Sequence, residues 1–151
     1  MSFQTKVLYT AKAHTTGGRE GGRSRTSDGR LDVQLTLPGA KGEGTNPEQL
    51  FAVGWSSCFL SAIKLEATTQ KISLPENVSI DAEVDLCTTD GQYVLQARLS
   101  VSLPGIDRMT AQKLVDGAHL LCPYSKAVHG NIKLETMIVE PRTTSDLSMA
   151  L

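Results

Sequence analysis

Alternation of polar and apolar residues is the clearest pattern in the chain, and it predicts a sheet. In RLDVQLTL, residues 30–37, every second side chain is apolar, which is typical of a half-buried strand. Two longer alternating runs flank Asp90 and Gly91, a dipeptide that favours the tight turn of an antiparallel hairpin. The segments 3–13 and 131–140 predict two more strands. The Gly-, Arg- and Ser-rich residues 15–29 are expected to form a loop.

A long helix is predicted to begin in TNPEQLFAVGWSSCFLSAIKLEATTQK, residues 45–71. Asn46 suits the cap position, and Pro47 suits the first helical position. Glu48 follows in the first turn, where the helix dipole favours a carboxylate. From Leu50 to Leu65 nearly every face is apolar or small, which predicts a central helix covered by a sheet or by a partner subunit.

A second helix is predicted in DRMTAQKLVDGAHLLCP, ending at or before Pro123. Its expected apolar side consists of Met109, Leu114, Val115, Ala118 and Leu121. The order strands, helix, hairpin, helix, strand predicts an α+β protein with a mainly antiparallel sheet. The 151 residues fit one domain, expected over residues 1–140, with a flexible tail over 141–151. A chain of this size can barely wrap the long apolar helix, so we expect a homodimer.

Composition then narrows the classes of function. A net charge of −1 gives no electrostatic case for binding nucleic acid or an anionic membrane. The N-terminus lacks the basic-then-apolar layout of a signal peptide. No stretch is expected to approach the roughly 20 apolar residues of a membrane span. The expectation is therefore a cytoplasmic protein, in which thiols are normally kept reduced.

Three cysteines carry the candidate chemistry. Cys58 lies in the middle of the long helix, where a thiol usually only packs, and Cys122 lies at a helix end near a turn. Cys87 lies on the polar, carboxylate-rich face of a strand, where a raised thiol pKa predicts that it is chemically idle. If two of these cysteines pair in a reducing compartment, the pairing is expected to be transient and chemical.

Packing, metal ligation and redox chemistry all remain open for Cys58 and Cys122 on the residues alone. A metal site would combine them with His119, three residues before Cys122, and His129, seven after it. However, the chain has no CxxC or HxxxH pair, which structural zinc sites usually show. A Cys–His nucleophile for acyl groups lacks any suggested orienting partner.

Four separated motifs resemble those of the organic hydroperoxide resistance proteins, the Ohr branch of the Ohr/OsmC family. They are GGREG, TSDGRLDVQL, GEGTNPEQLFAVGWSSCF and CPYSKAVHGN, and the resemblance covers roughly residues 5–140. It implies the OsmC-like fold, with mainly antiparallel sheets wrapped around long central helices in an intertwined homodimer. It also implies a thiol-dependent peroxidase that reduces organic hydroperoxides, including alkyl and fatty-acid hydroperoxides, to alcohols in oxidative-stress defence.

The resemblance further implies the site residues. Cys58 takes the place of the peroxidatic cysteine and Cys122 that of the resolving cysteine, with Arg19 and Glu48 as the other two catalytic groups. The expected cycle passes through a Cys58 sulfenic acid and a Cys58–Cys122 disulfide. An external dithiol, dihydrolipoamide on lipoylated proteins, is implied as the reductant. Neither a bound cofactor nor a metal is expected.

These four residues make chemical sense together. A guanidinium beside Cys58 lowers the thiol pKa and stabilises the departing alkoxide, and Glu48 can hold Arg19 in a bidentate pair. Without the family, an arginine in a Gly-rich loop is usually a solvated charge. Ten residues separate Glu48 from Cys58 on the predicted helix, which is about 15 Å. One Arg19 is then not expected to contact both residues within one chain. Either the helix bends or Glu48 comes from the partner subunit, and we favour a site shared across the dimer interface.

Two rival interpretations remain: an OsmC-branch peroxidase of broader substrate range, or a non-catalytic zinc-binding or structural protein. The chain departs from the family pattern at Trp55, where tyrosine is more usual, and in extra arginines beside the GGREG loop, Arg23 among them. Four aromatic residues are candidates for an apolar substrate channel, although core packing is the more common role of such residues: Phe51, Trp55, Phe59 and Tyr124.

Overall fold

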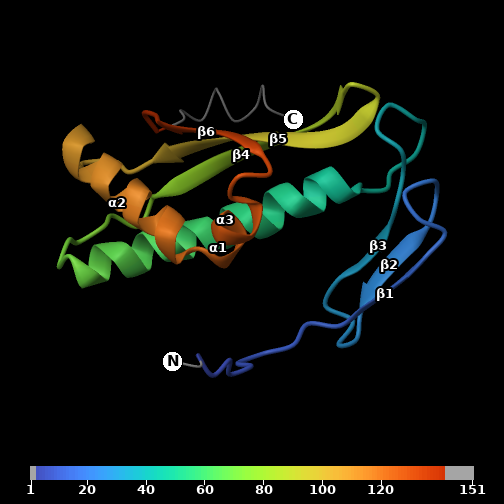
Figure 1. The fold of residues 1–151 in the computed structure, drawn as a ribbon, viewed down its shortest axis with the longest axis horizontal. Coiled ribbons are helices and arrows are strands. Elements are labelled where there is room, and N and C mark those ends of the chain that lie inside the picture. The colour runs from blue at the N-terminus through green and yellow to red at the C-terminus, as the bar shows by residue number, and fades with distance from the viewer. Residues whose placement is uncertain (1–2, 142–151) are drawn as a thin grey trace. The chain divides into compact units, whose positions relative to one another are not determined.

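The computed structural model describes residues 3–141 (Figure 1), so the predicted tail lies almost entirely outside the described residues. Contacts divide the chain into two compact units, residues 1–50 and residues 51–151, and each is described by itself. The elements in chain order are β1 (Ala13–Thr16), β2 (Arg23–Thr26), β3 (Asp32–Gln34), α1 (Pro47–Thr69), β4 (Ser79–Thr89), β5 (Gln92–Ser102), α2 (Arg108–Leu121), α3 (Pro123–Val128) and β6 (Lys133–Ile138). This division into two units does not test whether residues 1–140 form one domain, so that expectation stays a prediction.

The first unit contains a three-stranded antiparallel sheet in the order β1-β2-β3. Strand β2 and the end of β1 lie inside the segment 15–29 that we expected to be a loop, so that expectation is wrong for these strands, whereas residues 17–22 and 27–29 form turns and loops as expected. The sequence of β2, RSRT, has no apolar alternation to reveal a strand. Polar cross-strand partners stabilise it instead, including a bond from Arg23 Nε to Asp32 Oδ1 at 2.7 Å.

The strand expected over residues 3–13 is also wrong, because only Ala13 belongs to β1 and residues 3–12 have no regular structure. Their apolar side chains are open to solvent, with Phe3 at 94% and Leu8 at 86% exposure. A strand needs a hydrogen-bonding partner as well as suitable residues, and β-propensity reports only the second condition. The strand expected over 30–37 is confirmed only over its middle, as β3.

The second unit contains a three-stranded sheet in the order β4-β5-β6. The predicted hairpin is confirmed: β4 and β5 pair antiparallel from Ser79 with Ser102 to Thr89 with Gln92. Asp90 and Gly91 both have positive φ angles, 51° and 77°, as the tight turn requires. The predicted last strand is confirmed as β6, which pairs parallel with β5. The α+β class is therefore confirmed, with one parallel pair in a mainly antiparallel arrangement.

Helix α1 confirms the predicted start signals. Asn46 Oδ1 accepts a hydrogen bond of 2.9 Å from the Gln49 backbone N–H, and Pro47 is the first helical residue. One stripe of the helix is buried, whereas Val53 and Leu65 on its other faces are 64% and 57% exposed. Within one chain the helix is therefore only partly covered by other residues. This exposure is consistent with the expected homodimer, which stays a prediction.

By length and composition alone, α1 is also apolar enough to cross a membrane. The expectation that no stretch approaches such a span is therefore wrong on this criterion. The core helix of a soluble protein passes the same test. Figure 1 shows α1 running alongside the β4-β5-β6 sheet, and its buried residues belong to one hydrophobic cluster with those of β5 and α2.

Helix α2 buries a narrower stripe than predicted. Leu114, Val115 and Ala118 are buried as expected, but Met109 is 72% exposed and Leu121 is 38% exposed. At 100° per residue, Met109 falls on the side opposite the buried stripe, and Leu121 falls at its edge. The chain then turns at Cys122 into the short helix α3, which had not been predicted.

On the sheet, Arg98 of β5 binds Asp85 of β4 through two hydrogen bonds of 2.8 and 2.9 Å, and this contact makes the stability of the hairpin depend on pH. The hydrogen bonds from Arg98, followed by one from Gln96, lower the pKa of Asp85 to about 2. A carboxyl group with a lowered folded-state pKa stabilises the fold above its unfolded pKa, and this contribution is lost as pH falls through the folded value. We expect the melting temperature to decrease between about pH 4 and pH 2.

Asp85→Asn tests this contribution in the same titration. The variant is expected to melt at a lower temperature than the parent protein at pH 6, and to lose less further stability on acidification. Thermal melts at pH 6, 4 and 2 measure both quantities. An identical pH slope in the variant and the parent protein would show that this carboxyl contributes nothing to acid sensitivity.

Candidate active site

Cys58 and Cys122 are neighbours in the second unit, although 64 positions separate them along the chain. The Cys122 thiol donates to Cys58 Sγ across 3.4 Å, and both thiols are free. Helix α1 carries Cys58, whereas Cys122 is both the C-cap of α2 and the N-cap of α3. A disulfide needs the sulfurs at about 2.05 Å, so the two side chains would have to approach only slightly when an oxidant removes two electrons and two protons from the thiol pair.

The protonation of Cys58 is governed by its surroundings in this unit. Burial and then the hydrogen bond from Cys122 raise the pKa of the Cys58 thiol, while the Tyr124 backbone N–H acts in the opposite direction. The thiolate is the nucleophilic form of cysteine. A nearby cation would therefore increase the reactivity of Cys58 by lowering this raised pKa.

Two aromatic side chains pack together beside the turn of α1 that precedes Cys58. A Cβ atom on Gly54, one turn before Cys58, would lie 2.8 Å from the Tyr124 hydroxyl, so the missing side chain is what admits the tyrosine ring. Phe51 packs edge-on against Tyr124, with the ring centroids 6.2 Å apart. Trp55 and Phe59 are fully buried in the core, which confirms core packing for these two residues.

Four side chains, three of them within three residues of a site cysteine, form a hydrogen-bonded chain that the sequence did not predict. Trp55 Nε1 donates to Ser125 Oγ at 3.1 Å, Ser125 Oγ lies 3.1 Å from His119 Nδ1, and His119 Nε2 lies 3.0 Å from Thr136 Oγ1. Burial lowers the pKa of His119, which favours the neutral imidazole. The only sequence signal was the position of His119 and Ser125, each three residues from Cys122.

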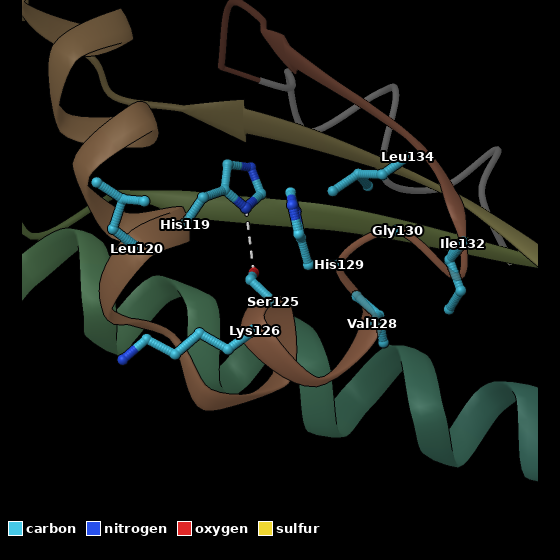
Figure 2. Close-up of a pocket in the computed structure, with 9 residues that line it drawn as sticks. All are labelled: His119, Leu120, Ser125, Lys126, Val128, His129, Gly130, Ile132 and Leu134. Atoms are coloured by element: carbon cyan, nitrogen blue, oxygen red, sulfur yellow. Dashed lines mark hydrogen bonds between the residues drawn. The ribbon is translucent and has the colours of Figure 1, made fainter.

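The zinc alternative required His119, His129 and Cys122 to converge. Within residues 3–141, no group of three or more His, Cys, Asp or Glu side chains is placed to hold a metal ion. His119 uses both ring nitrogens on hydroxyl groups instead. His129 lies on the wall of a neighbouring cavity of about 430 Å³, shown in Figure 2.

Arg19 and Glu48 meet in the first unit. Arg19 binds both carboxylate oxygens, with Nη2 to Oε1 at 2.9 Å and Nη1 to Oε2 at 3.3 Å. The two side chains are 31% and 11% exposed, so Arg19 is not the freely solvated charge that its loop suggested. Gly22 closes this loop so tightly that an added Cβ would lie 2.1 Å from the Thr16 carbonyl oxygen. The expected bidentate pair is present within one chain.

Comparison with known proteins identifies the family. The family described as OsmC-like protein matches residues 40–137. An organic hydroperoxide resistance protein from Xanthomonas axonopodis pv. citri is 48% identical over 136 residues, which cover 87% of this chain and 95% of that protein. The chain belongs to the OsmC-like family. Within this family, its resemblance to the organic hydroperoxide resistance proteins is confirmed.

Solved structures of OsmC-like proteins agree with this assignment. The organic hydroperoxide resistance protein OhrB of Bacillus subtilis has a TM-score of 0.83 at 38% identity, over 88% of this chain and 100% of that one. A Legionella pneumophila organic hydroperoxide resistance protein has a TM-score of 0.82 at 43% identity, over 88% and 98% of the two chains. The OsmC-like fold expected from the motifs is confirmed.

Proposed function

We propose that this OsmC-like protein is a thiol-dependent peroxidase that reduces organic hydroperoxides to alcohols in oxidative-stress defence. The observation that carries the proposal is the 3.4 Å approach of the Cys58 and Cys122 thiols. The names of its relatives, organic hydroperoxide resistance proteins, support the substrate class. Phe51 and Tyr124 near Cys58 give the apolar surroundings that suit alkyl and fatty-acid hydroperoxides.

In the first step, the Cys58 thiolate attacks the terminal oxygen of the hydroperoxide. A sulfur–oxygen bond forms while the oxygen–oxygen bond breaks, and the alkoxide takes up a proton and leaves as the alcohol. Cys58 is left as a sulfenic acid. The sulfur has been oxidised by two electrons and the peroxide reduced by two.

In the second step, Cys122 attacks the sulfenic sulfur of Cys58. The sulfur–sulfur bond forms and hydroxide departs as water, giving the Cys58–Cys122 disulfide. An external dithiol then exchanges with this disulfide and restores both thiols. Dihydrolipoamide on a lipoylated protein is the proposed reductant, and the cytoplasm, where thiols stay reduced, is the proposed location.

Arg19 is the proposed cation for Cys58. Its guanidinium would offset the effect of burial on the Cys58 pKa and stabilise the alkoxide, while Glu48 holds it in a bidentate pair. Glu48 and Cys58 both belong to α1, ten residues or about 15 Å apart along its axis. Because Arg19 binds Glu48 of its own chain, we propose that this ion pair serves the partner's Cys58 in a homodimer.

The test of the proposed function is a peptide mass map under non-reducing conditions. Reduced protein receives one equivalent of cumene hydroperoxide, and we expect a linked Cys58–Cys122 peptide with Cys87 left free. If both thiols stay free and unoxidised, the protein is not a peroxidase, and elemental analysis then tests the zinc alternative. Similar rates with cumene hydroperoxide and hydrogen peroxide would favour the broader OsmC-branch activity.

A further inference from the structure

We propose that the hydrogen-bonded chain of Trp55, Ser125, His119 and Thr136 positions Cys122, holding its thiol toward Cys58 for disulfide formation. His119 and Ser125 are then positioning residues, because they act through Cys122 and do not touch the reacting atoms. This inference rests on the proposed function only for its biological purpose. The pairing of the two thiols can be measured without any peroxide.

The two positioning residues lie symmetrically about Cys122. At Cys122 the backbone leaves helix α2 and enters helix α3, with an extended conformation of φ −68° and ψ 119°. The direction of the turn, and with it the direction of the thiol, depends on this one residue. The bond between His119 and Ser125 joins the last turn of α2 to α3 and so closes the junction across Cys122.

The chain is also anchored to α1 on both sides of Cys58. Trp55 lies three residues before Cys58 and donates to Ser125, while Phe59 immediately follows Cys58 and packs on the His119 ring at 4.3 Å between centroids. Thr136 of β6 holds the other nitrogen of His119. Helix α1, which carries Cys58, is thereby joined to α2 and α3 on both sides of Cys122.

A cavity borders one side of the junction, so hydrogen bonds take the place of packing on that side. The cavity of about 430 Å³ lies against His119 and Ser125, and Figure 2 shows both side chains on its wall with the bond between them. Packing from that side is therefore incomplete. Trp55 and Ser125 are nevertheless buried, at 0% and 6% exposure, so breaking their bond leaves a buried N–H without a partner.

The direction of the bonds follows from the chemistry of the groups. The indole N–H of Trp55 can only donate, so Ser125 Oγ accepts it and can give its own proton to His119 Nδ1. The neutral ring then carries its proton on Nε2 and donates it to Thr136. Every member of the chain is satisfied in this arrangement, which favours one orientation of the junction.

Amide substitutions at His119 separate its two hydrogen bonds. An asparagine amide can replace the ring nitrogen nearer the backbone, Nδ1, whereas a glutamine amide reaches the position of Nε2. His119→Asn therefore keeps the bond to Ser125 across the junction, and His119→Gln keeps the bond to Thr136. Both variants lose the ring that packs on Phe59, so each controls for that loss in the other.

The experiment measures the effective concentration of Cys58 and Cys122 by equilibrating the full-length protein with oxidised and reduced dithiothreitol. We expect Ser125→Ala and His119→Gln to lower it roughly tenfold, as the loss of one ordering hydrogen bond predicts. His119→Asn is expected to stay within about threefold of the parent protein, because it keeps the bond across the junction. Thermal melts establish that each variant is folded.

Equal effective concentrations of the two thiols in the folded His119→Asn and His119→Gln variants would overturn the inference, even if Ser125→Ala fails to fold. Failure of the proposed function has a different signature. In that case the parent protein and His119→Asn still pair their thiols in dithiothreitol buffer, but cumene hydroperoxide does not oxidise Cys58.

Discussion

Cys58→Ser is expected to abolish hydroperoxide reduction, lowering kcat/KM for cumene hydroperoxide by at least about 10⁴-fold. A serine hydroxyl does not ionise near neutral pH, so the variant lacks the nucleophile proposed to attack the peroxide bond. Consumption of cumene hydroperoxide with a dihydrolipoamide reductant measures the rate. Wild-type activity in Cys58→Ser would contradict the assignment of Cys58 as the peroxidatic residue.

Cys87→Ser is the matched control for this substitution. Cys87 is also a free, half-buried thiol, but it lies on β4 opposite Val94 and is expected to be idle. The variant should retain the parent rate.

Cys122→Ser should differ from both of these variants. It retains the first attack but lacks the thiol that captures the sulfenic acid, so Cys58 gains two or three oxygen atoms as peroxide is added. Intact mass spectrometry of the protein detects these additions.

Arg19→Ala is expected to lower kcat/KM by about 10²- to 10³-fold, the usual cost of removing one group that stabilises developing charge. The same substitution should raise the pKa of Cys58, because a guanidinium favours the thiolate. The pH dependence of Cys58 alkylation by iodoacetamide measures this pKa directly. Glu48→Gln should change both quantities in the same direction by a smaller factor, since it disturbs only the position of Arg19.

Arg23→Ala is the control for Arg19→Ala. Arg23 is the neighbouring loop arginine, but its guanidinium is engaged by Asp32 within the first sheet. The Arg23→Ala variant is expected to reduce cumene hydroperoxide at the rate of the parent protein and to have the same Cys58 pKa as the parent. A large decrease of kcat/KM in Arg23→Ala with no decrease in Arg19→Ala would mean that the family position identifies the wrong guanidinium.

Mixing an inactive variant with a strongly impaired one tests whether the site is shared between subunits. Chains with Arg19→Ala are unfolded and refolded together with chains that carry Cys58→Ser. In a shared site, each mixed dimer combines an intact Arg19 from one chain with an intact Cys58 from the other, so about a quarter of the parent activity returns. A site built within one chain leaves the mixture no more active than the Arg19→Ala chains in it, and that outcome would contradict the shared site.

The features that the sequence predicted well are those that depend on nearby residues. Asn46 caps α1 through a bond to a backbone N–H three residues away. Asp90 and Gly91 turn the hairpin because both adopt positive φ angles, and the alternation on either side matches the register of β4 and β5. Each of these interactions lies within a few residues along the chain or repeats at a regular spacing.

Pairing between strands was predicted poorly for the same reason. Strand β2 is polar and depends on partners on both sides. Residues 3–12 have strand-like residues but belong to no strand of the described chain, where a backbone hydrogen bond joins the Lys12 carbonyl to the Ser27 N–H. The exposure of Met109 likewise depended on which face of α2 meets the core. These outcomes are decided by neighbours that are remote in sequence, and local propensity does not report them.

The candidate site shows the same difference between local features and contacts of residues that are remote in sequence. The sequence by itself determined which reactive groups the site can contain: two thiols in separate motifs, an arginine in a glycine-rich loop and a carboxylate in the first turn of a helix. Only the tertiary structure decided that Cys58 and Cys122 lie 3.4 Å apart and that Arg19 binds Glu48. It alone joined Trp55, His119, Ser125 and Thr136, because these residues come from four different elements. A hydrogen bond between distant residues leaves no periodic trace in a single sequence, since it requires only that folding bring two suitable atoms within about 3 Å.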